Sequence, residues 1–364
     1  MRESGPEGRQ RPDGRDCALG RKGGGLVTAP RPSIAVLGAG SWATAVASIV
    51  ARNAPTVMWA RSPEVAAEIN HQSRNTRYTG DRLLPPNLRA TPHLAEAVAE
   101  ANMVVVGIPA RGFRAVLAEA AAFIRPRTPI VSLVKGLEQG SDLRMTEIVA
   151  ELLPGCPAGV LAGPNIAQEI VEGYAAAATL AMPDLGLACR LAEVFRTSRY
   201  RVYSSTDVVG VELCGALKNV FAIAAGMADG AGAGYNTKAM VITRSLREMA
   251  TLGSALGGEP ATFNGLAGNG DLIVTCMSPL SRNRRLGEAL GRGLAIAEAL
   301  ATIPQVAEGA GAVGVVKRLA DQQGVEAPTV REVDAVVNRG ARATDAYRGL
   351  LRDAPGHETH GHAW

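Results

Sequence analysis

The sequence predicts an α/β domain with a mostly parallel sheet, followed by an all-helical (all-α) C-terminal domain. Three observations lead to this prediction. Between residues 33 and 205, short β-rich runs alternate with helical stretches, the pattern of a parallel sheet covered by helices on both faces. Runs such as residues 103–106 are continuously apolar, which is typical of strands buried on both faces. After residue 206 long helical segments take over, punctuated by glycine and proline.

The expected elements follow in chain order. Strands are expected at Ser33–Leu37, Thr56–Trp59, Met103–Gly107, Pro129–Leu133, Gly159–Leu161, Ala176–Ala181 and Tyr200–Tyr203. Helices between them include Trp42–Arg52, Pro63–His71 and Arg111–Ile124. The second domain is expected to contain the helices Val208–Met227, Ala239–Leu256, Arg282–Leu290, Ala295–Ala301, Gly309–Gln323 and Val330–Asn338. We therefore divide the chain into residues 33–205 and residues 206–352.

The two ends of the chain fit neither domain. Residues 1–32 hold seven glycines, four prolines and six arginines with almost no apolar periodicity. This composition predicts a disordered leader, and it lacks the apolar core of a signal peptide. Residues 353–364 are expected to form a flexible tail.

The composition excludes several classes of function. Only 4% of the residues are aromatic, the net charge is +4, and no block of basic residues occurs, so nucleic-acid binding is not expected. The five cysteines are widely spaced and form no zinc pattern, so we expect no metal site. They favour a reduced, cytoplasmic protein. No apolar run approaches the length needed to span a bilayer.

A glycine-rich turn joins the first expected strand to the first expected helix. Residues 38–43 read GxGxxA, a variant of the dinucleotide-binding fingerprint. Gly38 permits the tight turn, Gly40 lets the backbone approach a pyrophosphate, and Ala43 allows close packing of helix against strand. The N–H groups at the start of the helix then face the phosphates. This pattern predicts a Rossmann-type dinucleotide-binding domain.

The second residue beyond the second expected strand bears on the choice of dinucleotide. NAD-preferring sites usually carry an acidic residue here, whereas this chain has Arg61. An arginine can pair with a 2′-phosphate through two hydrogen bonds, which favours NADPH or the use of both cofactors. A solvated arginine at the end of a strand is the alternative interpretation.

One lysine, Lys218, lies in the middle of a long and mostly apolar helical segment. Burying an ammonium group is unfavourable without a partner, and a desolvated lysine exchanges its proton nearer neutral pH. Its neighbours on the same helix face are the small residues Cys214, Gly215, Ala222 and Ala225, which leave room for a ligand. The alternative is a lysine that extends along the helix to reach water.

Four polar clusters are further candidates for a ligand site. Lys135 follows an expected strand, at the carboxyl end of the sheet where ligands bind in such folds. Residues 162–165 lie between a strand and a helix, and residues 265–272 form a glycine-rich loop ending in a carboxylate. Ser281 is a natural N-cap for a helix that begins with Arg282, a combination suited to a phosphate group. Each cluster taken singly is also compatible with a loop, a cap or a solvated face.

Together these motifs resemble the bacterial-type NAD(P)-dependent sn-glycerol-3-phosphate dehydrogenases, from about residue 33 to about residue 348. The resemblance rests on GAGSW at 38–42, VKGLE at 134–138, GPN at 163–165, GVEL at 210–213, ALKNV at 216–220, ITR at 242–244, GDL at 270–272, LSRNRR at 280–285 and QVAEG at 305–309. The lysine-helix and SRNRR motifs are specific to the family. This chain departs from it at Asn165, where many members carry Ser or Thr, at Ala43, where Gly is commoner, and at Asn269, where Leu is usual.

The resemblance implies reversible reduction of dihydroxyacetone phosphate to sn-glycerol 3-phosphate, which feeds phospholipid synthesis. Lys218 matches the family's catalytic proton-transfer residue. Implied substrate contacts are Lys135, Gly163, Asn165, Lys218, Asp271, Ser281, Arg282 and Asn283. Implied contacts with NADPH or NADH are Ser41, Trp42, Arg61, Ser62, Lys135, Ala167, Arg282, Val306 and Glu308, beside Gly38, Gly40 and Ala43 of the fingerprint. The family also suggests a homodimer.

Three roles follow within this expected site. Lys135 adds positive charge near the developing oxyanion, and Lys135 and Lys218 lower each other's pKa. Asp271 holds Lys218 or a substrate hydroxyl, while residues 281–283 anchor the phosphate group. Two alternatives stay open: a ketopantoate- or hydroxyacid-type reductase of similar architecture, and a nucleotide-binding sensor without catalysis.

Overall fold

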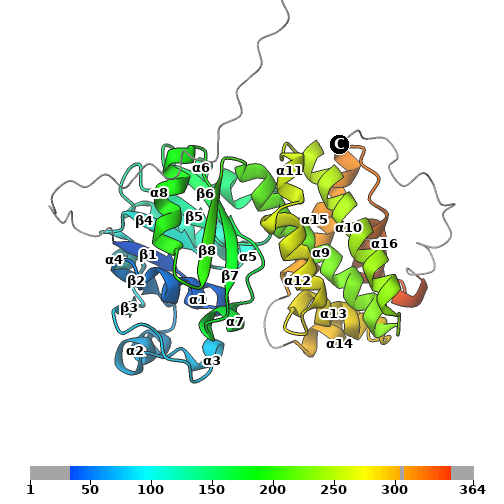
Figure 1. The fold of residues 1–364 in the computed structure, drawn as a ribbon, viewed down its shortest axis with the longest axis horizontal. Coiled ribbons are helices and arrows are strands. Elements are labelled where there is room, and N and C mark those ends of the chain that lie inside the picture. Colours follow the sequence, from blue (N-terminus) through cyan, green and yellow to red (C-terminus); the bar gives the residue numbers. More distant parts are fainter. Residues whose placement is uncertain (1–32, 304–306, 346–364) are drawn as a thin grey trace, which may run out of the picture. The chain divides into compact units, whose positions relative to one another are not determined.

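The computed structural model describes residues 33–303 and 307–345. The predicted leader and tail lie outside this part of the chain. An eight-stranded sheet is followed by a helical region, which confirms the predicted fold class (Figure 1). We retain the division between residues 205 and 206 as a proposal, since the last strand ends at Ser205 and the next helix begins at Val208.

The sheet has the strand order β3-β2-β1-β4-β5-β6-β7-β8. Its strands are β1 (Ile34–Leu37), β2 (Thr56–Trp59), β3 (Leu88–Thr91), β4 (Met103–Val106), β5 (Ile130–Ser132), β6 (Ala158–Ala162), β7 (Ala176–Ala181) and β8 (Tyr200–Ser205). All neighbours are parallel except β6 and β7. Strand β3 was not predicted from the sequence; it is an edge strand that pairs with β2 and carries the exposed Arg89 within its short apolar run.

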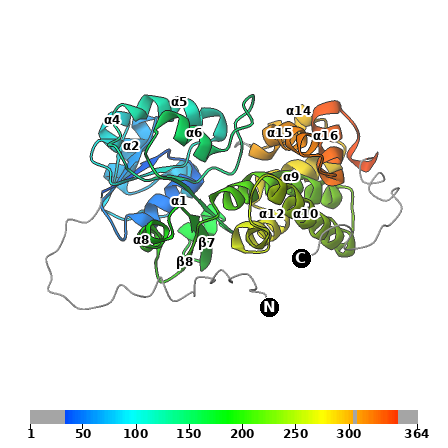
Figure 2. The ribbon, with the colours of Figure 1, turned by 90° about the horizontal axis from the view of Figure 1, so that it is seen from above.

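Helices cover both faces of this sheet, as predicted. They are α1 (Ser41–Val50), α2 (Pro63–Gln72), α3 (Thr76–Thr79), α4 (Leu94–Val98), α5 (Ala110–Ala121), α6 (Met145–Leu152), α7 (Ala167–Val171) and α8 (Leu185–Phe195). Helices α1, α2 and α8 share one apolar core with the sheet, and α4, α5 and α6 share the other (Figure 2). The carboxyl ends of the parallel strands are thereby left to carry loops that can bind a ligand.

The second region is helical throughout its described residues. It contains α9 (Val208–Gly230), α10 (Tyr235–Ala255), α11 (Pro260–Phe263), the π-helical turn η2 (Leu266–Gly270), α12 (Asp271–Met277), α13 (Arg282–Gly291), α14 (Ile296–Ala301), α15 (Glu308–Gln322) and α16 (Pro328–Arg339). The glycine-rich loop predicted at residues 265–272 was wrong. The segment is η2 running directly into α12, which places Asp271 at the start of a helix.

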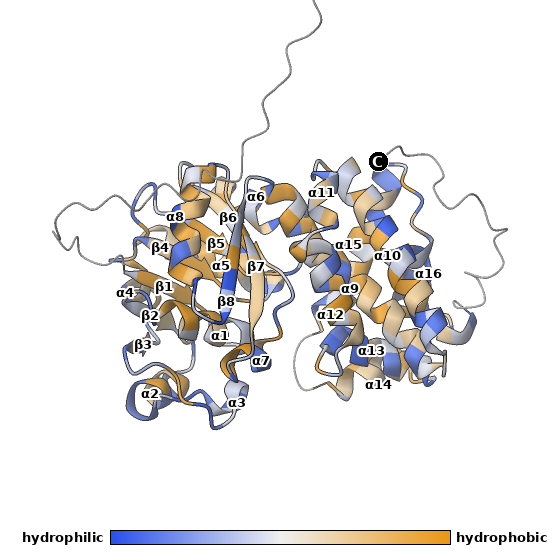
Figure 3. Ribbon diagram, in the orientation of Figure 1, coloured by the Kyte–Doolittle hydropathy of each residue, from blue (hydrophilic) through white to orange (hydrophobic). Residues whose placement is uncertain are grey.

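Helix α9 is the central element of the helical region (Figure 3). By length and composition it could cross a membrane, so the expectation that no run reaches that length was wrong. However, 89% of its apolar window is buried inside the protein, as in the core helix of a globular domain. Residues of β6 and β7 belong to the same apolar core, so α9 connects the helices to the sheet.

Glycines bring α9 and α13 unusually close together. A Cβ added at Gly226 would overlap the carbonyl oxygen of Arg284, and one added at Gly287 would overlap that of Ile223. Because backbone atoms cannot move aside as flexible side chains do, the two helices can pack this closely only without these side-chain atoms. This contact fixes the start of α13 relative to the helix that carries Lys218.

Three of the described cysteines, Cys156, Cys214 and Cys276, carry free thiols. Cys189 is disulfide-bonded, so the expectation of a fully reduced chain was wrong at this residue.

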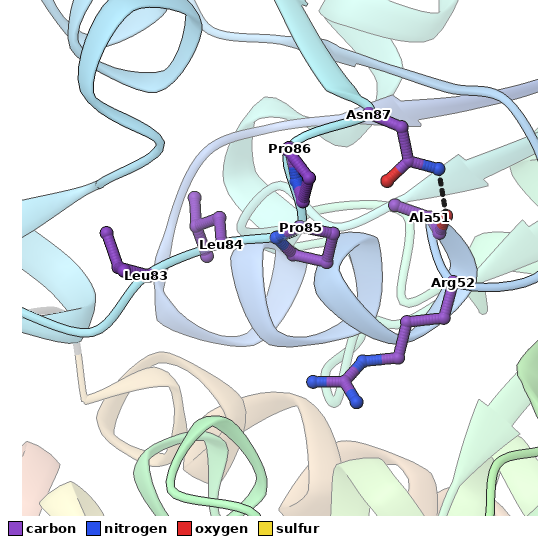
Figure 4. Close-up of a pocket in the computed structure, with 7 residues that line it drawn as sticks. All are labelled: Ala51, Arg52, Leu83, Leu84, Pro85, Pro86 and Asn87. Atoms are coloured by element: carbon purple, nitrogen blue, oxygen red, sulfur yellow. Dashed lines mark hydrogen bonds between the residues drawn. The ribbon is translucent and has the colours of Figure 1, made fainter.

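A shallow pocket of about 450 Å³ lies beside the edge strand β3 (Figure 4). Its lining includes Arg52 and the segment Leu83–Asn87, and Asn87 donates a hydrogen bond to the carbonyl oxygen of Ala51. No residue of the predicted site lines this pocket.

Candidate active site

Two lysines and one aspartate meet where the sheet faces the helical region. The Asp271 carboxylate accepts a hydrogen bond from Lys218 Nζ at 2.5 Å and another from Lys135 Nζ at 2.7 Å. Lys135 follows β5, whereas Lys218 lies on α9 and Asp271 begins α12. Lys135 Nζ also donates to the carbonyl oxygen of Gly163 at 3.1 Å. The structure therefore brings together four residues that the sequence predicted as substrate contacts.

Lys218 is buried, with 4% of its surface exposed, so it does not extend along the helix to water. Burial lowers its pKa to about 7, and the positive charge of Lys135 acts in the same direction, whereas Asp271 opposes the shift. Its ammonium group also donates to Thr275 Oγ1 at 2.7 Å. The structure therefore holds this lysine where both its protonated and neutral forms are accessible near neutral pH.

A chain of side-chain amides links the lysine site to the start of α13. Asn219 donates to the carbonyl oxygen of Lys135 at 2.7 Å, and its own oxygen accepts from Asn283 Nδ2 at 2.8 Å. The oxygen of Asn283 in turn accepts the backbone N–H of Gly309 at 3.0 Å. Asn283 thus joins α9, α13 and the start of α15 in one network.

Ser281, Arg282 and Glu308 lie near Asn283, at the starts of α13 and α15. Ser281 caps α13 as predicted, by accepting the backbone N–H of Arg284 at 3.3 Å. Arg282 is exposed. Burial raises the pKa of Glu308, and the positive charges of Arg282, Lys135 and Lys218 oppose that shift. Glu308 therefore lies within electrostatic reach of all three cations.

The glycine-rich turn has the shape that a dinucleotide requires. Gly38 has φ +110°, and a Cβ there would come within 2.9 Å of the Gly107 carbonyl oxygen. A Cβ at Gly40 would meet nothing within 4 Å, so space is open above the start of α1. Ala43 packs against Gly107, since a Cβ added at Gly107 would lie only 2.7 Å from the Cβ of Ala43. No side chain caps α1, leaving its first N–H groups to a phosphate.

Two further observations support a ligand beside this turn. Trp42 Nε1 is buried and has no hydrogen-bond partner among the described residues, and an unpaired buried donor is unfavourable without one. Asn75, which sequence analysis missed, donates to the carbonyl oxygen of Ala39 at 2.9 Å and to Thr44 Oγ1 at 2.8 Å. These bonds fix the turn, so the residues present fit a dinucleotide.

The other predicted cofactor residues are placed as follows. Arg61 is exposed just beyond β2, and Ser62 caps α2 by accepting the backbone N–H of Val65 at 3.3 Å. Ala167 begins α7, while Ser41 begins α1 at the glycine-rich turn. Val306 lies outside the described residues.

Thr275 is the contact of Lys218 that sequence analysis missed. It lies four residues after Asp271 on α12, so both side chains are on one face of the helix. Its hydroxyl donates to the Asp271 carbonyl oxygen at 2.6 Å while accepting from Lys218. Helical spacing would have revealed it had α12 been predicted.

A sheet with this glycine turn, joined to a helical region that buries Lys218 against Asp271, defines the class of NAD(P)-dependent oxidoreductases with a second, helical part. The chain belongs to the NAD-dependent glycerol-3-phosphate dehydrogenase family. The model of the family's N-terminus matches residues 33–188, and that of its C-terminus matches residues 207–348.

Individual relatives agree with this assignment. Glycerol-3-phosphate dehydrogenase [NAD(P)+] of Mycobacterium avium (strain 104) is 58% identical over 331 residues, covering 91% of this chain and 97% of that protein. The protein of that name, numbered 2, from Sphingopyxis alaskensis is 48% identical over 330 residues, covering 91% and 99%. A crystal structure of glycerol-3-phosphate dehydrogenase from Coxiella burnetii has a TM-score of 0.85 at 35% identity, covering 89% and 99%. A ketopantoate reductase from Ralstonia eutropha JMP134 shares the fold alone, with a TM-score of 0.55 at 15% identity.

Proposed function

We propose that this chain reversibly reduces dihydroxyacetone phosphate to sn-glycerol 3-phosphate with NADPH or NADH, and that Lys218 moves the proton. The observation that carries the assignment of Lys218 is its burial against Asp271, with Lys135 on the other carboxylate oxygen. Membership of the dehydrogenase family supports the substrate and the cofactor.

Lys218 provides the proton for the substrate oxygen. A dinucleotide held at the glycine-rich turn would supply a hydride to the carbonyl carbon, leaving the substrate oxygen in need of a proton. An ammonium group has three N–H donors, and within the described chain Asp271 and Thr275 take two of them. The third is available to the substrate oxygen, which accepts the proton in reduction and returns it in oxidation.

Lys135 and Asp271 set the electrostatics of this transfer. The ammonium group of Lys135 stabilises negative charge that develops on the substrate oxygen. Asp271 keeps two cations close together in a site where only 1% of its own surface is exposed. Without that carboxylate the two ammonium groups would repel each other at low effective dielectric.

The start of α13 serves as the phosphate anchor in this proposal. The N–H groups of its first turn and the guanidinium of Arg282 suit a phosphate group. Ser281 and Asn283 flank this position, and Asn283 keeps a second amide N–H beyond the one that Asn219 accepts. Anchoring the phosphate orients the reacting carbon. Gly163 and Asn165 complete the substrate contacts that we propose.

For the dinucleotide, we propose contacts from Gly38, Gly40, Ser41, Trp42 and Ala43 at the glycine-rich turn. Further contacts are assigned to Arg61, Ser62, Lys135, Ala167, Arg282, Val306 and Glu308. Arg61 favours NADPH because its guanidinium can pair with the 2′-phosphate of that cofactor. From the family resemblance we also propose a cytoplasmic homodimer that supplies phospholipid synthesis.

The test is a substrate panel with the purified chain. NADPH absorbance is followed with dihydroxyacetone phosphate, ketopantoate, pyruvate and a blank without substrate. We expect absorbance loss with dihydroxyacetone phosphate well above the other three. Faster loss with ketopantoate or pyruvate would assign the chain to another reductase class, and no loss with any of them would favour a sensor.

A further inference from the structure

The amide of Asn165 has one satisfied end and one unsatisfied end. Its oxygen accepts a hydrogen bond from the Tyr200 hydroxyl at 3.0 Å. Its Nδ2 atom is buried and has no hydrogen-bond partner in the described chain. Leaving a buried donor unpaired is unfavourable, and such groups in native proteins commonly have a ligand or water as their partner.

The unpaired Nδ2 lies at the lysine site. A Cβ built on Gly163, where φ is +153°, would stand 3.2 Å from Nδ2. The carbonyl oxygen of the same glycine accepts Lys135 Nζ at 3.1 Å. The amide and the Lys135 ammonium group therefore flank one backbone turn after β6.

Tyr200 has the properties needed to orient that amide. It begins β8 and is 3% exposed, so its ring is fixed in the core of the sheet domain. Burial and the negative charge of Asp271 both raise the pKa of its hydroxyl, which stays protonated and able to donate. Because this hydroxyl donates to the amide oxygen of Asn165, the NH₂ group is turned away from Tyr200.

We propose that Tyr200 is a positioning residue that holds Asn165 with its NH₂ group aimed at an oxygen of the phosphorylated substrate. The inference rests on the proposed function, since it assigns a specific donor to that reaction. Asn165 was expected from the sequence as a substrate contact, whereas Tyr200 was not.

The experiment compares Tyr200→Phe, Asn165→Ala and the double variant with the wild type. Tyr200→Phe keeps the buried ring and removes only the hydroxyl. We expect its KM for dihydroxyacetone phosphate to rise about fivefold, the factor for one lost hydrogen bond. The Kd for NADPH should change less than about twofold. The double variant should match Asn165→Ala within about twofold, because Tyr200 acts through that amide.

A matched control is Tyr203→Phe, on the same strand, where the ring is 48% exposed. It should leave KM, Kd and melting temperature unchanged. Additive effects of the two substitutions on KM, or a wild-type KM for Tyr200→Phe in an active enzyme, would overturn the role of Tyr200 and leave the proposed function standing. A wild type that does not turn over dihydroxyacetone phosphate would overturn the proposed function, and this inference with it.

Discussion

Replacing Asp271 by asparagine perturbs the centre of the site without changing its shape. The substitution removes one negative charge that two ammonium groups share, at 2.5 and 2.7 Å. Asp271 raises the pKa of Lys218, while burial and Lys135 lower it to about 7. Asp271→Asn should therefore lower this pKa further, and Lys135→Met should raise it.

The size of the shift follows from the contact distances. An opposite charge this close changes a pKa by about 1–3 units. In the reduction direction Lys218 must be protonated, so kcat/KM falls as pH rises through its pKa. Asp271→Asn should move this alkaline limb down by about 1–3 units, and activity above the limb should fall about tenfold per unit. Lys135→Met should move the limb in the opposite direction.

The assay measures kcat/KM for dihydroxyacetone phosphate between pH 5 and pH 9 for both variants and the wild type. Circular dichroism shows whether each variant is folded, because breaking a buried ion pair costs about 3–5 kcal/mol of stability. A limb at the same pH in all three folded enzymes would refute the assignment of that limb to Lys218.

Three other predictions concern packing, stability and the cofactor. Gly287→Ala should destabilise the chain by about 1–3 kcal/mol in urea titration, because the added Cβ would overlap α9. Gly112→Ala places its Cβ in open space and should stabilise the chain by up to about 1 kcal/mol. Equal effects of the two substitutions on the free energy of unfolding would contradict the packing argument. Burial raises the pKa of Glu248 from 4.5 to about 7, so its contribution to stability falls as pH rises across that range. Glu248→Gln should remove roughly 3 kcal/mol of this pH dependence. An unchanged dependence of the free energy of unfolding on pH in this variant would contradict the prediction. Arg61→Ala should lower the ratio of kcat/KM for NADPH to that for NADH, and an unchanged ratio would remove Arg61 from the cofactor site.

Most strands of the sheet and the lysine helix were predictable because their patterns are local. Continuous apolar runs identify buried strands, and the GxGxxA turn lies directly between a strand and a helix. β3 was missed because Arg89 interrupts a run of only four residues at the sheet edge. Glycine density led to the prediction of a loop at residues 265–272, whereas packing in the helical core imposes a π-helical turn there.

The contacts of the site were less predictable because they join residues far apart in the chain. The family motifs named Lys135, Lys218 and Asp271, yet only the fold brings these residues, which lie up to 136 positions apart, onto one carboxylate. Thr275 and Tyr200 have ordinary local sequence patterns. The role of Thr275 depends on its place on the helix, which puts its hydroxyl beside Lys218. The role of Tyr200 depends on a hydrogen bond from its hydroxyl to Asn165, which lies on a different segment.

The most direct test of the central claim is Lys218→Met, which keeps an apolar side chain of similar length and removes the amine. Turnover of dihydroxyacetone phosphate and binding of NADPH are measured on the same folded preparation. We expect turnover to fall at least about 10²-fold, the contribution of a positioned proton-transfer group, while the Kd for NADPH stays within about twofold. Near-normal turnover in this variant would contradict the role of Lys218.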